Sequence, residues 1–401
     1  MAYPFTLGDV AFLRSREGAA ALAAVGSLPL TKDSHLRDVA AVRRRHPEHA
    51  AALVETVLLR RKAGSKVEDP DRWLFTDTAL QQATAAPVAR HRAHRFADRD
   101  VHDLTCSVGV DLAALGAVAK QCIGSDLDPV RLAMARHNCP DVTVVRADAT
   151  RPVTKGTALF ADPARRDAVG RRRWRAADFL PPLDALAEAY AGRDLAVKCA
   201  PGMDFDALPF AGEVELVSLD GAVREACLWT NGLATAATRR ATVLNPDGTQ
   251  WTITDAEPDD CAVGEPGEWI VDPDGAVVRA GLVRHYAHRH GLWQLDERIA
   301  YLTGDVPPPG VRAFRVREFG HYTEKALRAT LRRLGVGVVE ILVRGLDIDP
   351  NALRPRLKLS GSASVSVVLT RIGRTPTAFV CDAVSVVDTQ IDTKNRTKRV
   401  Q

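Results

Sequence analysis

The chain has 401 residues, of which 46% are hydrophobic and 26% are charged, and its formal net charge at pH 7 is +4. The mixture of both charge signs with this apolar content excludes a disordered polyelectrolyte, and the length predicts about two to four domains. The small excess of basic residues permits a nucleic-acid partner without requiring one.

The cysteine pattern and the N-terminal residues indicate in which cellular compartment the protein resides. No CxxC pair and no tight His/Cys group of the kind that binds zinc occurs, so we expect no structural metal. No segment approaches the ~20 apolar residues that cross a bilayer, and the first residues lack the pattern of a secretory leader. These features predict a soluble, cytoplasmic protein in a reducing compartment, without membrane contact. The seven scattered cysteines are Cys106, Cys122, Cys139, Cys199, Cys227, Cys261 and Cys381.

Residues 1–95 are expected to form a helical N-terminal domain. Its clearest helix begins at Pro47, because proline is favoured in a first helical turn, and ends at Gly64. Apolar residues recur there at helical spacing: Ala50, Leu53, Val54, Val57 and Leu58.

Residues 96–235 are predicted to form an α/β domain. Short apolar runs alternate there with Ala/Leu-rich stretches, which is typical of βαβ units and a parallel, Rossmann-like sheet. The expected strands are 101–104, 122–124, 142–145, 157–160 and 195–197. The expected helices are 111–119, 129–138 and 178–191.

Two small α+β domains are expected at 236–315 and 316–401. Strands without intervening helices are predicted from Glu213 to Thr254, and Pro/Gly/Asp-rich sequence favours boundaries near Thr235 and Gly310. The last domain should contain a helix at 322–334, strands at 338–343, 365–369 and 378–381, and a basic tail from Lys394 to Arg399.

A turn of small residues joins an expected strand to an expected helix. The strand ends at Asp103, and the turn contains Thr105, Ser107 and Gly109. Small residues let a ligand approach the backbone, and amide groups at a helix N-terminus attract negative charge. Thr105 and Ser107 replace the glycines of a dinucleotide-binding turn, so a pyrophosphate fits poorly. A methionine-type ligand fits better, because Asp103 can face its ammonium; a purely structural turn is the alternative.

Two further carboxylates end neighbouring strands. Asp126 can accept hydrogen bonds from both hydroxyls of a ribose, and Asp148 can accept one from an adenine amino group. Each could be a solvated strand end, but three carboxylates on consecutive strands are unlikely to coincide by chance. We therefore predict a cofactor site that also includes the residues that follow them, Leu127 and Ala149.

The next strand ends in Asp162-Pro163-Ala164-Arg165, at the edge of the sheet where the acceptor of a transferred group would lie. Asp162 can accept a hydrogen bond from an amine or a ring N–H, and Pro163 stiffens the backbone that presents it. Asp162, Pro163 and Arg165 are therefore the candidate catalytic residues. An ordinary Asp-Pro turn is the structural alternative.

The chain resembles the class I S-adenosylmethionine-dependent methyltransferases, in particular a bacterial group with a THUMP-like domain at the C-terminus. The resemblance covers nearly the whole chain and implies S-adenosylmethionine as cofactor, a seven-stranded methyltransferase sheet, a ferredoxin-like middle domain and a THUMP-like end. Since THUMP domains accompany RNA modification, it also implies tRNA or rRNA as the acceptor. The matching segments are 74–76, 80–84, 103–106, 160–166, 197–202 and 339–345.

The segment after the transfer motif is rich in arginine. Six arginines and one tryptophan lie within residues 165–175. Arginine pairs with phosphate in a bidentate manner, and an indole can stack on an unpaired base. We therefore expect RNA contact here, with a solvated charged face as the alternative. The expected contacts are Arg166, Arg171, Arg172, Arg173, Trp174 and Lys198.

Our leading hypothesis is direct in-line transfer of a methyl group to a nucleobase nitrogen of RNA, with the base oriented by Asp162 and backbone carbonyls. Three alternatives stay open. Cys199 occupies a position similar to the nucleophile of RNA 5-methyluridine methyltransferases, so C5 methylation of a pyrimidine is one. The others are methylation of a small molecule and a non-catalytic RNA-binding protein.

Overall fold

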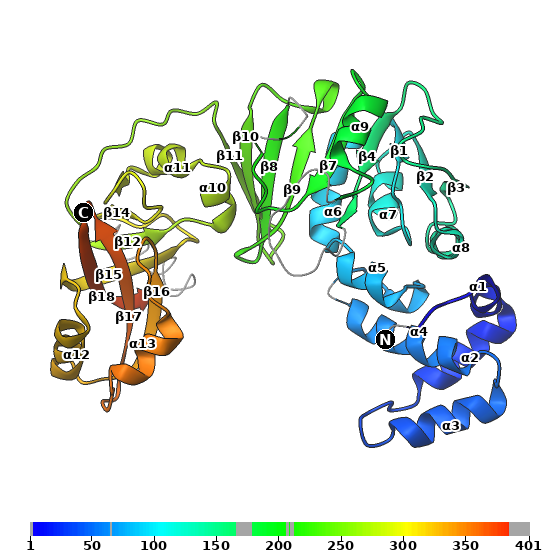
Figure 1. Cartoon of the computed structure of the whole chain (residues 1–401), viewed down its shortest axis with the longest axis horizontal. Helices are drawn as coiled ribbons and strands as arrows, with labels where there is room; N and C mark the ends of the chain where they lie inside the picture. Colours follow the sequence, from blue (N-terminus) through cyan, green and yellow to red (C-terminus); the bar gives the residue numbers. More distant parts are fainter. Residues whose placement is uncertain (1–2, 65, 166–178, 206–207, 209–211, 385–401) are drawn as a thin grey trace, which may run out of the picture. The chain divides into compact units, whose positions relative to one another are not determined.

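The computed structural model describes residues 3–64, 66–165, 179–205, 208 and 212–384 (Figure 1). The chain forms two compact units, one of residues 1–215 with 224–236 and the other of residues 216–223 with 237–401. None of the described helices combines the length and the apolar character that a bilayer crossing requires. The division into four domains stays a prediction.

The first unit begins with helices, as the sequence predicts. A capping box starts the first of them: the Asp9 amide donates to the Thr6 hydroxyl (3.1 Å), and the Thr6 amide donates to the Asp9 carboxylate (2.9 Å). Ser15 caps the second helix by accepting from the Gly18 amide (3.0 Å). The helices are α1 (Leu7–Arg14), α2 (Arg16–Gly26), α3 (His35–Arg45), α4 (Ala50–Ala63), the 3-10 helix η1 (Pro70–Arg72), α5 (Asp77–Gln82), α6 (Ala86–Ala93) and η2 (His94–Phe96).

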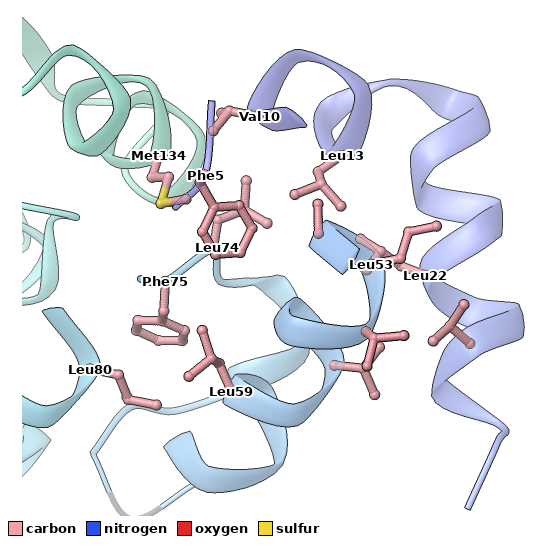
Figure 2. Packing of buried hydrophobic residues seen from close by; sticks show 14 of the residues in the cluster. Phe5, Val10, Leu13, Leu22, Leu53, Leu59, Leu74, Phe75, Leu80 and Met134 are labelled. Atoms are coloured by element: carbon pink, nitrogen blue, oxygen red, sulfur yellow. The ribbon is translucent and has the colours of Figure 1, made fainter. Parts of the chain in front are cut away.

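One apolar core joins these helices to the α/β part of the unit. Leu13, Leu53 and Leu74 from the helical segment are buried in the same cluster as Met134 (Figure 2). Val108 belongs to this cluster as well. Met134 lies on α8 (Pro129–Asn138), a helix of the α/β part. The helical segment therefore has no separate core, and α8 packs directly against it.

The α/β part contains the expected sheet. Strands β3, β2, β1, β4 and β7 pair in parallel, and β9 pairs antiparallel with β7; residues 216–219 of β8 and 222–223 of β9 are counted with the second unit. The carboxyl ends of these parallel strands lie at one edge of the sheet, where crossover folds bind their ligands. The strands are β1 (Asp100–Asp103), β2 (Gln121–Asp126), β3 (Thr143–Arg146), β4 (Ala158–Ala161), β7 (Leu195–Cys199), β8 (Glu213–Leu219) and β9 (Ala222–Trp229); α7 (Val110–Gly116), α8 and α9 (Leu183–Ala189) complete this part, with η4 (Asn231–Leu233).

The helix expected at 178–191 begins later than predicted. Residues Phe179–Leu180 form a short strand, β6, which pairs antiparallel with β5 (Ala164–Arg165). Pro181 and Pro182 follow, and a proline disfavours helical backbone in the residue before it, so α9 starts only at Leu183. The segment before α9 is therefore extended.

The second unit is α+β. Its large sheet has the order β13-β14-β12-β15-β18-β17-β16, and β15 pairs with both β12 and β18, so the boundary expected near residue 315 falls inside a strand. Asp274 caps a short helix by accepting from the Ala276 amide (2.7 Å). The elements are β10 (Arg239–Leu244), β11 (Gln250–Thr254), β12 (Trp269–Asp272), α10 (Gly275–Arg279), α11 (Val283–His290), β13 (Trp293–Gln294), β14 (Leu302–Gly304), β15 (Arg312–His321), α12 (Glu324–Arg333), β16 (Val336–Val343), α13 (Pro350–Arg356), β17 (Ala363–Ile372) and β18 (Thr375–Val384).

Candidate functional site

A cavity of about 590 Å³ opens at the carboxyl ends of β1, β2, β3 and β4. Seven of the residues predicted from sequence line it: Thr105, Ser107, Asp126, Leu127, Asp148, Ala149 and Asp162. Three others, Asp103, Gly109 and Pro163, lie in the same segments but do not line the cavity. The tertiary structure thus brings together residues that are spread over some sixty positions of the sequence.

The turn after β1 adopts a backbone conformation that side chains rarely take, and its amide groups are bonded within the protein. Ser107 and Gly109 both have positive φ values, 49° and 95°. A Cβ atom on Gly109 would lie 2.8 Å from the Cys139 sulfur, so this position requires glycine on two grounds. The Ser107 amide donates to the Asp126 carboxylate (3.0 Å), which ties the turn to the end of β2.

Asp103 lies beneath this turn and is almost fully buried. One carboxyl oxygen accepts from the Thr105 amide (3.1 Å), and the other has no hydrogen-bond partner among the described residues. Burial, followed by the nearby negative charges of Asp111 and Asp162, raises the pKa of Asp103 well above its usual range. A cation at this end of β1 would stabilise the ionised form of Asp103. This is the property expected of a carboxyl group that faces the ammonium of a ligand.

Asp126 and Asp148 have spare acceptor capacity toward the cavity. Asp126 accepts from the amides of Ser107 and Asp128 (2.8 Å), which uses one lone pair on each oxygen and leaves two. Asp148 accepts from the amide and the hydroxyl of Thr150 with one oxygen, and these bonds lower the pKa of Asp148. Leu127 is 57% exposed and lines the same cavity, where it offers an apolar surface.

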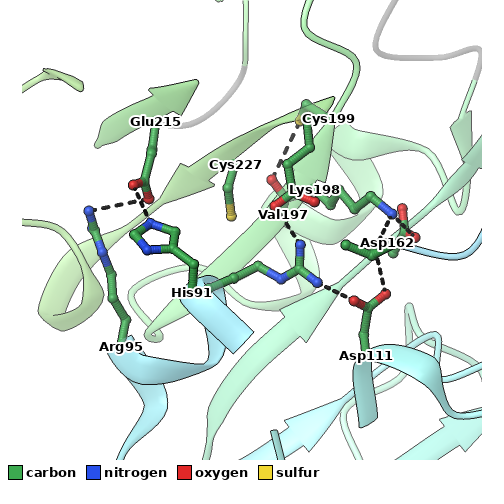
Figure 3. A network of polar contacts seen from close by, with 12 residues as sticks. His91, Arg95, Asp111, Asp162, Val197, Lys198, Cys199, Glu215 and Cys227 are labelled. Atoms are coloured by element: carbon green, nitrogen blue, oxygen red, sulfur yellow. Dashed lines mark hydrogen bonds and ion pairs between the residues drawn. The ribbon is translucent and has the colours of Figure 1, made fainter. Parts of the chain in front are cut away.

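Asp162 is held from two sides. Its amide donates to the Thr105 hydroxyl (2.7 Å), and its carboxylate accepts from the Lys198 ammonium (2.7 Å). The same ammonium donates to the Thr84 hydroxyl (2.8 Å), and Figure 3 shows Lys198 reaching Asp162 from β7. Burial alone would lower the pKa of Lys198, but the carboxylates of Asp162 and Asp111 outweigh it and raise that pKa. Lys198, which we expected to face RNA, instead turns inward to orient Asp162.

A chain of buried polar contacts extends from the Asp162–Lys198 ion pair. Thr84 donates to Asp111 (3.2 Å), Asp111 pairs with the Arg92 guanidinium, and Arg92 pairs with Glu225 (2.5 Å). The guanidinium lies 4.5 Å from the centre of the Phe160 ring on β4. Arg92 therefore connects α6, α7 and the sheet below the site.

Several lining residues were missed by the sequence analysis. Leu180, Pro181 and Pro182 line the cavity from the segment that was assigned to a helix, and Gln82 and Ala83 line it from the end of α5. The two prolines in succession were the available signal for the first group. For the second, the matching segment 80–84 was noted only as a resemblance.

The arginine-rich segment is only partly described. For Arg165 the structure gives its place in β5, next to Phe179 of β6. Arg166, Arg171, Arg172, Arg173 and Trp174 lie outside the described residues.

Cys199 is a poor candidate for a nucleophile. Its side chain is buried, its thiol donates to the Val197 carbonyl (3.6 Å), and it does not line the cavity. Burial, reinforced by Asp162 and Glu225, raises the pKa of Cys199 to about 12. A thiolate is the reactive form, so this environment suppresses reactivity. Within the described part of the chain, no group of three or more His, Cys, Asp or Glu side chains could hold a metal ion.

Comparison with known proteins shows which family models, relatives and solved structures the chain is similar to. The THUMP domain-like family model matches residues 311–383, and a model of a domain of unknown function, DUF8688, matches residues 6–63. An uncharacterized S-adenosylmethionine-dependent methyltransferase of Mycobacterium tuberculosis, found in strains CDC 1551 and H37Rv, is 54% identical over 85% of this chain and 99% of its own length. A crystal structure described as a methyltransferase of Porphyromonas gingivalis W83 matches 96% of this chain and 100% of its own, with a TM-score of 0.74 and 18% identity, and so shares the fold.

The sheet order, the cavity at its carboxyl edge and the high identity to a full-length relative lead to one conclusion. The chain belongs to the S-adenosylmethionine-dependent methyltransferases with a THUMP-like C-terminal domain, and S-adenosylmethionine is its cofactor.

Proposed function

We propose that this enzyme methylates a nucleobase nitrogen of tRNA or rRNA, and that Asp162 positions the acceptor. The observation that carries the proposal is the place of Asp162, at the end of β4 on the wall of the cofactor cavity, with its carboxylate fixed by Lys198. A fixed carboxylate at this edge can accept a hydrogen bond from an exocyclic amine or a ring N–H, and so hold the nitrogen lone pair toward the methyl donor.

The cavity walls suit S-adenosylmethionine. We assign Asp126 to its ribose hydroxyls and Asp148 with Leu127 to its adenine. Asp103 does not line the cavity but lies beneath the turn that does, and we assign its second carboxyl oxygen, which has no partner among the described residues, to the ammonium, directly or through water. When bound, the cofactor supplies a methyl group on a sulfonium, which an aligned nucleophile can displace. The protein's own contribution is orientation, because each carboxylate is held by backbone amides or by Lys198 before a ligand arrives.

Two features support RNA as the acceptor. The arginine-rich segment 165–175 directly follows the transfer motif, where its charges can neutralise backbone phosphates. The THUMP domain-like match at 311–383 adds a module of a kind that accompanies RNA modification. C5 methylation through Cys199 is disfavoured, because the raised pKa of that thiol and its burial oppose nucleophilic attack. Nucleoside mass spectrometry on cells with and without the gene is the direct test: loss of one N-methylated base supports the proposal, and an unchanged set of RNA nucleosides contradicts it.

Replacing Asp126 with alanine should weaken binding of S-adenosylmethionine by about 1–3 kcal/mol, through loss of the ribose hydrogen bonds. Isothermal titration calorimetry measures this directly, and Asp141→Ala, an exposed acid just after α8, is the matched control. Equal affinity of the two variants would remove Asp126 from the site. Folded wild-type protein that gives no binding heat at high cofactor concentration would contradict the cavity assignment as a whole.

Reversing Arg171, Arg172 and Arg173 to glutamate should remove most of the RNA affinity and flatten its salt dependence, since each phosphate contact contributes about −0.7 to the slope of log affinity against log salt. Filter binding with bulk tRNA and rRNA fragments over a range of salt measures both quantities. The control reverses Arg43, Arg44 and Arg45, three exposed arginines of α3. If the Arg171–Arg173 variant binds RNA as tightly as wild type at every salt concentration, the segment is a solvated face and a small-molecule acceptor becomes the better hypothesis.

A further inference from the structure

A second hollow of about 640 Å³ lies in the helical segment, away from the cofactor cavity. Its floor includes Leu13 and Leu22, which belong to the buried core shown in Figure 2, so the hollow is built on packed side chains. Positive charge predominates in its lining, which contains four arginines and one acidic residue. The charged and titratable residues are Arg14, Arg60, Arg61, Arg72, Asp71 and His137.

Two of the arginines are fixed by the backbone. Arg60 donates to the Trp73 carbonyl (2.8 Å), and Arg61 donates to the carbonyls of Pro29 (2.8 Å), Gly26 (3.0 Å) and Leu28 (2.6 Å). These bonds neutralise no charge, because carbonyl groups are uncharged. Arg60 and Arg61 are therefore held in place by uncharged partners, and Asp71 is the single acid of the lining.

The other two arginines are available to a ligand. Arg14 is exposed and has no hydrogen bond or ion pair with the described residues, and Arg72 has only a loose contact of 3.9 Å with Asp69. Burial, and then the positive charges of Arg14, Arg60 and Arg72, lower the pKa of His137. Burial also lowers the pKa of Arg60, against the opposing effect of Asp71 and Asp69. Three arginines of the lining thus act on His137, and an anion bound in the hollow would reduce the repulsion among these positive charges.

One helix connects this hollow to the cofactor cavity. Arg131, near the start of α8, lines the cofactor cavity, and His137, near its end, lines the hollow. Six residues of helix correspond to a rise of about 9 Å. Because α8 also packs into the shared core through Met134, the hollow and the cofactor cavity are held at a set separation.

We propose that this arginine-lined hollow binds the phosphate backbone of the RNA substrate, so that the helical N-terminal segment anchors the strand whose base enters the transfer site. The inference rests on the proposed function, since it takes RNA as the acceptor. Guanidinium groups are suited to phosphate through paired N–H donors, and contacts of this kind position a nucleic acid without selecting its sequence.

The test uses the full-length protein with Arg14→Glu and Arg72→Glu together, because both side chains are exposed and neither supports the backbone. The charge-matched control is Arg43→Glu with Arg44→Glu, on the exposed face of α3 outside the hollow. Filter binding with bulk tRNA and rRNA fragments should show that the hollow variant binds about tenfold more weakly near physiological salt. The salt slope should be shallower by about 1.4, the amount for two phosphate contacts. Thermal unfolding and calorimetry with S-adenosylmethionine should match wild type.

The outcomes separate this inference from the proposed function. Wild-type protein that binds no RNA at any salt concentration would overturn both. Wild-type protein that binds RNA, together with a hollow variant that binds it equally well, would overturn the hollow alone. An equal loss of RNA affinity in the α3 control would show that the effect comes from overall charge, and would also overturn the inference about the hollow. If inorganic phosphate binds the wild-type protein at the hollow, while the hollow variant binds RNA as tightly as wild type, the hollow serves a small anion and not RNA.

Discussion

Replacing Arg92 with alanine is expected to lower the free energy of unfolding by about 3–5 kcal/mol, the cost of removing one partner from a buried ion pair. The Arg92 side chain is 2% exposed and pairs with both Asp111 and Glu225. Without it two carboxylates would remain buried with no compensating guanidinium, and the contact with the Phe160 ring would also be lost. Urea unfolding, followed by circular dichroism, measures the change.

Arg90→Ala is the matched control, because Arg90 lies on the same helix and pairs with Glu68 at the surface. Exposed pairs of this kind contribute about 0–1 kcal/mol. If the two variants unfold at the same urea concentration, the charge chain below the site does not stabilise the fold. A further variant, Arg92→Lys, keeps the charge but loses the paired N–H donors, and should fall between the two.

Replacing Asp162 with alanine is expected to reduce methyl transfer by about tenfold to a hundredfold while leaving most of the cofactor affinity, as for loss of an orienting group. The reason is its position: it lines the cavity, and its carboxylate is held by Lys198 and its amide by Thr105. Transfer is measured with labelled S-adenosylmethionine on bulk RNA from cells that lack the protein, and cofactor affinity by calorimetry.

Three comparison variants make this result interpretable. Asp162→Asn keeps an oxygen that can accept from Lys198, so it distinguishes loss of transfer from local misfolding. Asp184→Ala removes an exposed acid at the start of α9 and should have no effect. Cys199→Ser should retain activity; if it alone abolishes turnover while Asp162→Ala remains active, the C5 mechanism replaces transfer to a nitrogen.

Much of the cofactor cavity could be predicted from local sequence because strand ends and turns have local signatures. Asp126 is the last residue of β2 and Asp148 lies two residues after β3, and the carboxyl ends of parallel strands meet at one edge of the sheet. Seven of the residues predicted from these signatures therefore line one cavity. The Ala/Leu-rich composition that follows Leu180 favours a helix, but Pro181 and Pro182 keep the residues before Leu183 out of it, so the helix predicted at Leu180 was wrong.

The side-chain partners could not be predicted in this way. Lys198 follows an apolar strand and precedes Cys199, and nothing local indicates that its ammonium turns to Asp162, 36 positions earlier. Likewise Arg92 lies in a basic helix with Arg90, yet one side chain is buried and the other exposed. The arginine that forms buried ion pairs is the one that lies next to Asp111 and Glu225 in the folded protein. The packing of α6 and α7 on the sheet decides those positions.

The sequence by itself thus determined the fold class, the helical start of the chain, the sheet and the carboxylates at its edge, because periodicity, capping and turn residues act over a few neighbouring positions. Only the tertiary structure decided that the helical segment and the sheet share a core, and that Arg14, Arg60 and Arg72 surround one hollow with His137. Burial and Coulomb interactions depend on distance in space, so side chains far apart in the sequence acquire their environment only when the chain has packed.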